Sequence, residues 1–357
     1  MREIRLARPS IGFREIISVV RVLSSGKLAQ GKYVGNFESE FSKLVADRDC
    51  VAVNSGTSGL HVALLALGVG PGDEVIVPSF TFAATANSVS LTGATPVFAD
   101  IDLDTFNISI KSIEELITHR TKVIQVVHLY GLPADMSAII EIARNHNLLI
   151  IEDAAQAHLA SINGQPVGTF GDAAVFSFYP TKNMTSGEGG MVVLKHPEAA
   201  RTVRLLRNQG MEKRYENEIV GMNLRMTDIH AAIGLEQLKK ITKWTGMRIR
   251  NAKYLSGKLK TVICPEIPAG YTHVYHQYTI KIIGDRDSFI EYLRIHGIES
   301  GIYYPTPVHR LPAFNNDITL PNTERACSQV ISLPIHPKLK KRDLRRIVRV
   351  VNGYSAE

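Results

Sequence analysis

The chain of 357 residues has little of what marks several specialised protein classes. It contains three cysteines, Cys50, Cys264 and Cys327, an odd number without metal-ligand spacing, which argues against a disulfide framework or a metal centre and favours a reducing compartment. No apolar run approaches the roughly 20 residues that span a bilayer, and the start Met-Arg-Glu opens no apolar signal region. We therefore predict a soluble, cytoplasmic protein without a bound metal.

Clustered charge is also scarce. The net charge is +7, but the basic residues are spread out, and only KLKKRDLRRIVR at 338–349 is dense. That stretch is either a solvated helix face or a patch for an anionic ligand or nucleic acid. No helix-turn-helix segment accompanies it, so we expect no nucleic-acid partner, although the positive balance would help to attract a phosphorylated substrate.

Short apolar runs alternate with helical stretches between about residues 50 and 195. Seven runs are continuously apolar, as expected of strands buried on both faces: VAVNS, DEVIVPS, TPVFAD, VIQVVHLY, LLIIEDA, AAVFSFY and GMVVL. The alternation predicts an α/β fold with a mainly parallel seven-stranded sheet covered by helices on both sides. Residues 12–46 and 226–260 are expected to be helical. ICPEI, HQYTIKII and the helix SFIEYLRIHG then suggest a smaller α+β domain, which divides the chain into 1–245 and 246–357.

The segment NSGTSG joins the first of these strands to a helix. Small residues at such a turn let backbone N–H groups approach an anion, and the helix dipole favours a phosphate there. Thr57 and Ser58 are the expected contacts. Ordinary helix capping explains the same residues.

EDAAQAH places Asp153 at the carboxyl end of an apolar strand, where open α/β sheets bind their ligands. Alternation along the strand predicts that Glu152 points to the opposite face. A carboxylate at this position can keep a pyridine nitrogen protonated; a helix cap or an ion pair is the simpler interpretation.

FSFYPTKN places Ser177 five residues before Lys182, after another apolar run. Partial desolvation at the edge of the sheet would lower the pKa of the lysine and make its amine nucleophilic. Lys182, Asp153 and Ser177 together fit pyridoxal phosphate (PLP), with a lysine for the aldehyde, a carboxylate for the ring nitrogen and a hydroxyl for the phosphate.

The ordered motifs GTSGL, PSFTFAATAN, EDAAQAH, FSFYPTKNMTSGEGG, GMNLRMTDIHAAIG, GIYYPTPVH and SLPIHP resemble the PLP-dependent nucleotide-sugar aminotransferases of the DegT/StrS type. The resemblance covers about residues 5 to 350. It implies the fold type I architecture of aspartate aminotransferase and a homodimer with shared active sites.

The resemblance also assigns roles to single residues. Lys182 would bind the cofactor covalently and act as general acid and base, and Asp153 would pair with the ring nitrogen. The other cofactor contacts it implies are Gln156 at the phenolic oxygen, Phe82 on the ring face, Thr57, Ser58 and Ser177 at the phosphate, and Asn223 at the phosphate of the partner subunit. Arg225, Tyr304 and His309 would lie near the substrate, and a charged loop with Lys213, Arg214 and Tyr215 is either a nucleotide contact or solvated.

The implied reaction moves an amino group from an amino acid, expected to be L-glutamate, to a 3-keto or 4-keto nucleotide sugar, for cell-surface polysaccharide or secondary-metabolite glycosylation. An aminotransferase for another keto-polyol, such as a keto-cyclitol, stays open, as does a non-enzymatic regulator. Related sugar dehydratases replace the lysine by histidine, so Lys182 favours transamination. The sequence departs from the family's usual glycine at Leu159, where we expect altered packing and unaltered chemistry.

Overall fold

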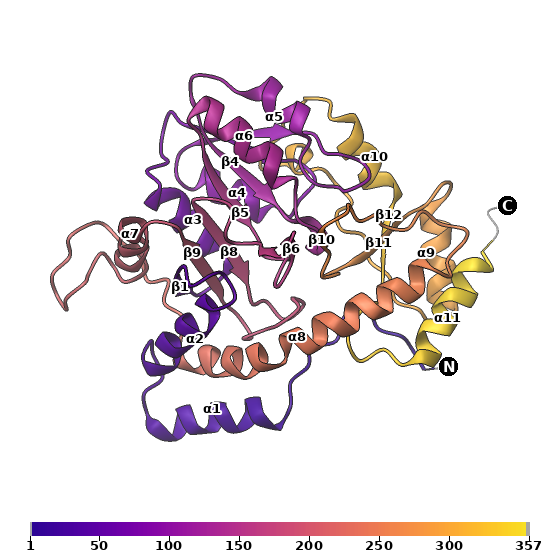
Figure 1. The fold of residues 1–357 in the computed structure, drawn as a ribbon, viewed down its shortest axis with the longest axis horizontal. Coiled ribbons are helices and arrows are strands. Elements are labelled where there is room, and N and C mark those ends of the chain that lie inside the picture. Colours follow the sequence, from indigo (N-terminus) through magenta and orange to yellow (C-terminus); the bar gives the residue numbers. More distant parts are fainter. Residues whose placement is uncertain (1, 355–357) are drawn as a thin grey trace.

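A seven-stranded sheet forms the centre of the computed structural model, which describes residues 2–354 (Figure 1). The strands follow the order β1-β9-β8-β5-β4-β2-β3, and β9 alone is antiparallel to its two neighbours. Their bounds are β1 Asp49–Val53, β2 Glu74–Pro78, β3 Thr95–Ala99, β4 Thr121–Val127, β5 Leu149–Asp153, β8 Ala173–Ser177 and β9 Gly190–Leu194. All seven predicted strands and the mainly parallel sheet are confirmed.

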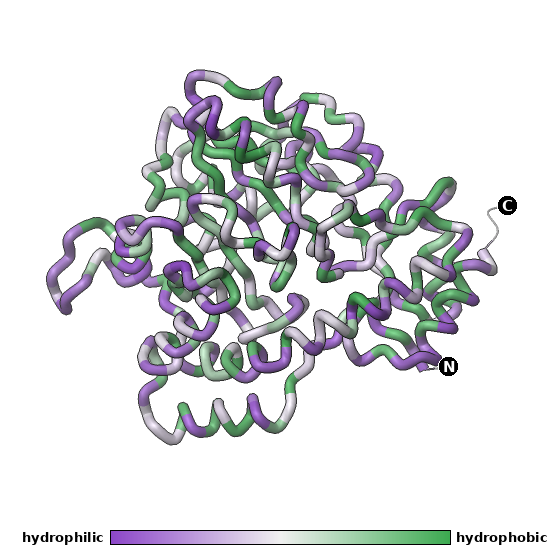
Figure 2. Tube along the Cα trace, in the orientation of Figure 1, coloured by the Kyte–Doolittle hydropathy of each residue, from purple (hydrophilic) through white to green (hydrophobic). Residues whose placement is uncertain are grey.

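Helices cover both faces of this sheet. The helical bounds are α1 Phe13–Ser25, α2 Lys32–Ser42, α3 Gly56–Ala66, α4 Ala84–Ser90, α5 Ile110–Leu116, α6 Met136–His146, α7 Pro197–Arg207, α8 Asp228–Ser256, α9 Arg286–Ile295, α10 Pro321–Gln329 and α11 Lys341–Asn352, with 3₁₀ turns η1 Leu129–Gly131 and η2 Val308–Arg310. One core unites α3, α4 and α7 with the sheet, and two others lie beneath α2 and α8 and beneath α5 and α6. Figure 2 shows the result as hydrophobic strands inside a more hydrophilic surface.

Burial on both faces explains the unbroken apolar runs. In β8, Val175 belongs to the core beneath α3, whereas Ala174 and Phe176 belong to the core beneath α2. Successive side chains alternate between the two faces of a strand, so neither face tolerates polar residues here. Gly59 lets α3 lie close to the sheet, because a Cβ at that position would come within 2.7 Å of Val175.

The C-terminal elements build a separate core. The short strands β11 Tyr278–Lys281 and β12 Val330–Leu333 pair antiparallel, and α9, α11 and the end of α8 pack around them. Ile4 lies in the same core and bridges to Ile298, so the first residues of the chain pack with its last elements. The prediction of a strand at ICPEI is wrong, because the segment forms a single isolated bridge, from Ile263 to Lys281. A division of the chain near residue 245 stays a prediction, since α8 runs through that position as one helix.

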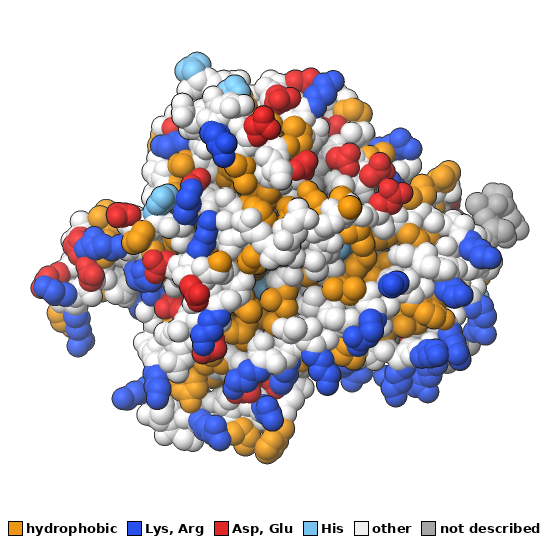
Figure 3. All heavy atoms as spheres, viewed as in Figure 1, with side chains coloured by type: hydrophobic (Ala, Val, Ile, Leu, Met, Phe, Trp, Pro, Cys, Tyr) orange, Lys and Arg blue, Asp and Glu red, His pale blue; other side chains and the backbone are white. Residues whose placement is uncertain are grey.

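Three further short strands, β6 Ser161–Ile162, β7 Gln165–Pro166 and β10 Tyr271–Thr272, form a small antiparallel sheet. Just before it, Leu159 takes a φ of 67°. A left-handed backbone suits glycine better than leucine, which gives a physical reason for the family's usual residue. Lys and Arg side chains gather at the end of the molecule where α11 and the N-terminus lie (Figure 3). Within residues 2–354, no helix is long and apolar enough to cross a membrane.

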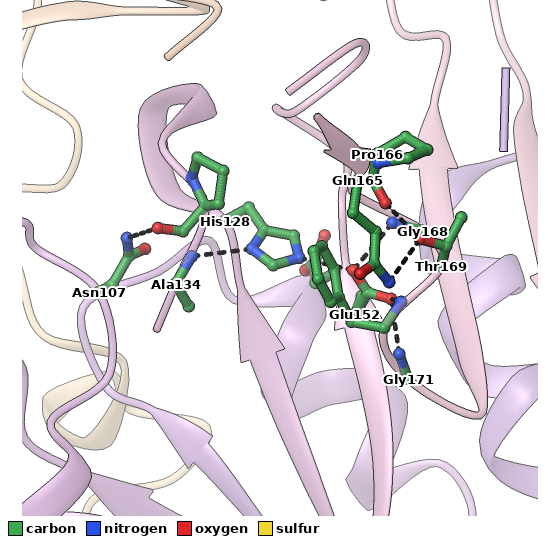
Figure 4. A network of polar contacts seen from close by, with 12 residues as sticks. Asn107, His128, Ala134, Glu152, Gln165, Pro166, Gly168, Thr169 and Gly171 are labelled. Atoms are coloured by element: carbon green, nitrogen blue, oxygen red, sulfur yellow. Dashed lines mark hydrogen bonds and ion pairs between the residues drawn. The ribbon is translucent and has the colours of Figure 1, made fainter. Parts of the chain in front are cut away.

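The Glu152 side chain ties three parts of the chain together (Figure 4). It is fully buried and accepts hydrogen bonds from the backbone N–H groups of Gly168 at 2.8 Å, Phe170 at 2.9 Å and Gly171 at 2.8 Å. His128 Nε2 lies 3.0 Å from the carboxylate, and the backbone N–H of Ala134 donates to Nδ1 of the same ring at 3.0 Å. Because Nδ1 accepts, Nε2 bears the proton and donates to Glu152.

These donors outweigh the effect of burial on Glu152. Burial alone raises the pKa of this carboxyl group, but His128 and the N–H groups of Gly171 and Gly168 bring its pKa below the ordinary value of 4.5. The stabilisation is therefore complete where the unfolded chain is also ionised, and it is lost as the pH falls through the lowered folded pKa. The predicted orientation of Glu152, away from Asp153, is confirmed.

We predict that Glu152→Gln lowers the free energy of unfolding by about 2–4 kcal/mol, because an amide NH₂ would face N–H donors in a buried site. Urea unfolding at pH 7 measures the loss, and Glu141→Gln on the exposed side of α6 is the matched control. The difference in the free energy of unfolding between wild type and variant should narrow below pH 4.5. A gap that stays constant down to the acid transition would contradict this role for the carboxylate.

Candidate active site

A cavity of about 420 Å³ opens at the carboxyl ends of strands β5 and β8. It brings together seven residues predicted from the sequence: Thr57, Phe82, Asp153, Gln156, Ser177, Lys182 and Tyr304. They come from positions 57 to 304, on strands, helices and loops that meet only in the folded chain.

One end of the cavity is suited to a phosphate. Ser55, Gly56 and Thr57 line it at the N-terminus of α3, and Ser177 lines it at the end of β8. A Cβ on Gly56 would lie 3.0 Å from Cβ of Ser177, so glycine is what allows the two segments to approach. The helix dipole and the free N–H groups of the first turn favour an anion here.

Ser58 has a different place from the one predicted. Its backbone N–H donates to Oγ of Ser55 at 3.1 Å, and its own Oγ lies 2.9 Å from the same atom. It is not among the residues that line the cavity. Ser55 is the residue that caps α3, and it lines the cavity as well.

Asp153 is fixed by two donors. Thr85 Oγ1 donates to Oδ2 at 2.9 Å, and the backbone N–H of Ala155 donates to Oδ1 at 3.2 Å. Burial raises the pKa of this carboxyl group, although Ala155, Thr85 and the positive charge of Lys182 oppose the shift. No residue between 2 and 354 forms an ion pair with Asp153 within 4.0 Å, so a cationic ring nitrogen would supply the charge that a buried carboxylate needs.

Lys182 follows β8 through a turn closed by its own N–H, which donates to the carbonyl of Tyr179 at 2.9 Å. Burial lowers the pKa of its amine to about 8, and the charge of Asp153 opposes that shift. The predicted direction is confirmed. The neighbouring His158 and His276 are buried, and burial together with the charge of Lys182 lowers the pKa of His158 to about 3 and that of His276 well below its usual range. Both imidazoles are therefore neutral at physiological pH.

Gln156 has a fixed orientation. Its Oε1 accepts from the backbone N–H of Tyr130 at 2.7 Å, so its NH₂ group is the side that donates, to Oη of Tyr304 at 3.1 Å. Burial, followed by the charge of Asp153, raises the pKa of Tyr304, which stays a phenol. Phe82 is 60% exposed and stands 6.0 Å from the ring of Tyr304. Such exposure fits a residue that stacks on a ligand better than one that fills a core.

Besides Ser58, three predicted residues lie outside this cavity. Asn223 is exposed and bridges to Asn208, and Arg225 Nη1 donates to Oδ1 of Asn208 at 2.9 Å. His309 is buried, with Nδ1 2.6 Å from Oγ of Ser79. Its surroundings are those of a structural histidine, and the sugar-pocket role predicted for it has no support in this geometry.

The sequence reasoning missed several cavity residues. Glu188, His276 and Tyr303 line the cavity. Thr85, which donates to Asp153 without lining the cavity, was missed as well. Glu188 lies in the quoted segment TSGEGG, and Tyr303 lies in GIYYPTPVH directly before the predicted Tyr304, whereas nothing in the sequence near His276 indicated its position.

The residues present fit PLP. Asp153 would face the ring nitrogen, Gln156 the phenolic oxygen and Phe82 the ring face, while Ser55, Thr57 and Ser177 would hold the phosphate. When bound, the cofactor supplies an electron sink that makes the Cα–H bond of an amino acid acidic. The chain itself supplies the amine of Lys182, whose pKa of about 8 lies near neutral pH. This amine can hold or release a proton at that carbon.

Comparison with known proteins identifies the family. Residues 9–352 match the DegT/DnrJ/EryC1/StrS aminotransferase family. A UDP-N-acetyl-3-dehydro-alpha-D-glucosamine 3-aminotransferase of Acidithiobacillus ferrooxidans is 42% identical over 341 residues, covering 94% of this chain and 92% of that protein. A GDP-perosamine synthase of Caulobacter vibrioides is 42% identical over 335 residues, covering 90% of each.

The crystal structure of Streptomyces venezuelae DesV in complex with a ketimine intermediate superposes with a TM-score of 0.91 at 40% identity, over 95% of this chain and 93% of that one. The fold type I architecture is thus confirmed. Solved relatives include PLP and PMP forms, and the family depends on PLP. The chain therefore belongs to the DegT/DnrJ/EryC1/StrS aminotransferase family and is a PLP-dependent aminotransferase.

Proposed function

We propose that this enzyme transfers an amino group from L-glutamate to a keto sugar linked to a nucleoside diphosphate, in the cytoplasm. The observation that supports the proposal best is that half-buried Lys182 and buried Asp153 line one cavity together with a phosphate cradle. Relatives named as an aminotransferase of a UDP-linked sugar and as a transaminase of a dTDP-linked sugar support the substrate class.

Lys182 is the group that moves the proton. Its pKa of about 8 lies near physiological pH, where an amine can both accept and return a proton at useful rates. The neutral rings of His158 and His276 do not compete with it as cations. Tyr304 and Gln156 act as donors on the other side of the cavity and orient what binds there.

The anionic substrates point to a second subunit. Of the residues that line the cavity, Lys182 is the one lysine and none is arginine, while Glu188 and Asp153 are acidic. A dicarboxylate donor and a nucleoside diphosphate both need cations to balance their charge. We propose that a homodimer brings Asn223 and Arg225 of one subunit to the cavity of the other. Lys213, Arg214 and Tyr215, on the exposed loop after α7, would come with them.

We predict that Lys182→Ala lowers transamination by about 100- to 10,000-fold or more, because the proton-transferring amine is lost. The assay pairs glutamate, glutamine, alanine and aspartate with 3-keto and 4-keto hexoses on UDP, GDP and dTDP, and a keto-cyclitol is included. Lys111→Ala, at an exposed lysine of α5, is the control. Full activity in Lys182→Ala would overturn the mechanism. If the keto-cyclitol were the only acceptor turned over, the proposed nucleotide-sugar substrate would be wrong.

The pKa of Lys182 predicts how the cofactor-free protein takes up PLP. The rate should rise with pH and level off above about pH 8, because the neutral amine is the nucleophile and its fraction grows as the pH passes the pKa. Stopped-flow absorbance measures this profile. In Asp153→Asn the pH at which this rate is half-maximal should be lower, since the charge of Asp153 raises the pKa of Lys182. A rate that still climbs at pH 10 in the wild type would show an ordinary, solvated lysine.

The shared site predicts complementation between two impaired variants. Lys182→Ala lacks the amine, and Asn223→Asp would place a negative charge beside the partner's cofactor phosphate. Mixed dimers formed by refolding the two together contain one intact site, so activity should recover to about a quarter of wild type. If each subunit's site were complete on its own, mixing would restore nothing.

A further inference from the structure

A second cleft, of about 360 Å³, lies where the start of the chain crosses the segment between β12 and α11. Its lining residues are Arg2, Glu3, Ile4, Arg5, Arg8, His336, Lys338, Leu339 and Asp343. None of them lines the cofactor cavity. The cleft belongs to the basic end of the molecule seen in Figure 3.

Positive charge in this cleft has little to balance it. Four cations line it, Arg2, Arg5, Arg8 and Lys338, and none of the four forms an ion pair within residues 2–354. Lys338 donates to the carbonyl of Pro9 at 3.1 Å. Burial and repulsion from Arg8 lower the pKa of this lysine.

Two carboxylates also line the cleft, but one is engaged elsewhere. Asp343 accepts from the backbone N–H of Lys340 at 2.9 Å and lies 3.7 Å from Arg342. It thereby caps the first turn of its own helix, α11. Glu3 is exposed and is the remaining counter-charge. The four cations thus exceed the two carboxylates, before the capping role of Asp343 is considered.

His336 provides an independent sign of a ligand. Its side chain lines the cleft and is only 6% exposed, yet its Nδ1 has no hydrogen-bond partner among the described residues. An unsatisfied buried polar atom costs free energy unless a bound group satisfies it. Burial, and repulsion from Arg248, Arg8 and Lys338, lower the pKa of this ring to about 4, although a hydrogen bond to the backbone of Arg5 opposes the shift, so the ring is neutral in the free protein.

We propose that this cleft binds a phosphate or diphosphate group of a small molecule, at a site separate from the cofactor cavity. Guanidinium groups match phosphate oxygens in pairs, and three of them with a lysine around a cleft of this size suit a compact, multiply charged anion. The site lies outside the amino-transfer reaction and does not depend on which sugar the enzyme uses.

Arg2→Gln/Arg5→Gln tests the proposal. Both arginines are exposed, so the double variant should fold, whereas Arg8 also lines a narrow opening beside Lys182 and is left intact. Arg144→Gln/Arg325→Gln removes the same charge from exposed positions on α6 and α10 and serves as the control. Calorimetry with inorganic pyrophosphate uses PLP-loaded protein reduced with borohydride, which keeps the cofactor's phosphate cradle filled.

The affinity for pyrophosphate should fall about tenfold or more in Arg2→Gln/Arg5→Gln and stay unchanged in the control. A second arm with UDP shows whether the same cleft accepts a diphosphate attached to a nucleoside. The reaction with the amino donor alone should run at the wild-type rate in both variants, which confirms an intact cofactor site. Equal pyrophosphate affinity in all three proteins, or an equal loss in the two variants, would overturn the proposal.

Discussion

Alternation of side chains at the end of β5 puts two neighbouring carboxylates into opposite environments. Glu152 faces a set of donors that satisfies it and lowers its pKa, whereas Asp153 faces the cavity, where burial raises its pKa. The first carboxylate joins His128 after β4, strand β5 and the loop at 168–171 through hydrogen bonds. These bonds hold the end of β5, and with it Asp153, in place, although burial disfavours the charge of Asp153. The catalytic arrangement depends on this division of roles.

The sheet could be predicted because its cause is local. A strand buried on both faces must be apolar throughout, and all seven such runs became strands. Asp153, Ser177 and Lys182 followed from the same reasoning, since they stand at the ends of these strands or just beyond them. The strand predicted at ICPEI did not form, because Pro265 has no backbone N–H to donate and Ile263 alone bridges to another strand, at Lys281.

The rest of the site depends on contacts between distant parts of the chain. Nothing near Thr85 in the sequence says that its hydroxyl meets Asp153, 68 residues away. Ser58 was the predicted contact, but the helix begins at Gly56, which makes Ser55 the cap and leaves Ser58 hydrogen-bonded to it. His309 follows an aromatic motif that lines the cavity, yet it turns toward Ser79, 230 residues away. In each case the decisive partner is fixed by packing, which spacing along the chain does not encode.

Thr85 also has a second neighbour in the site. Its hydroxyl donates to Asp153, while its backbone N–H donates to the carbonyl of Phe82 at 3.1 Å. The residue proposed for the nitrogen of the cofactor ring and the residue proposed for its face are therefore joined through a single turn of chain. A substitution at position 85 would act on both contacts at once, on the tilt of the ring and on the carboxylate at its nitrogen.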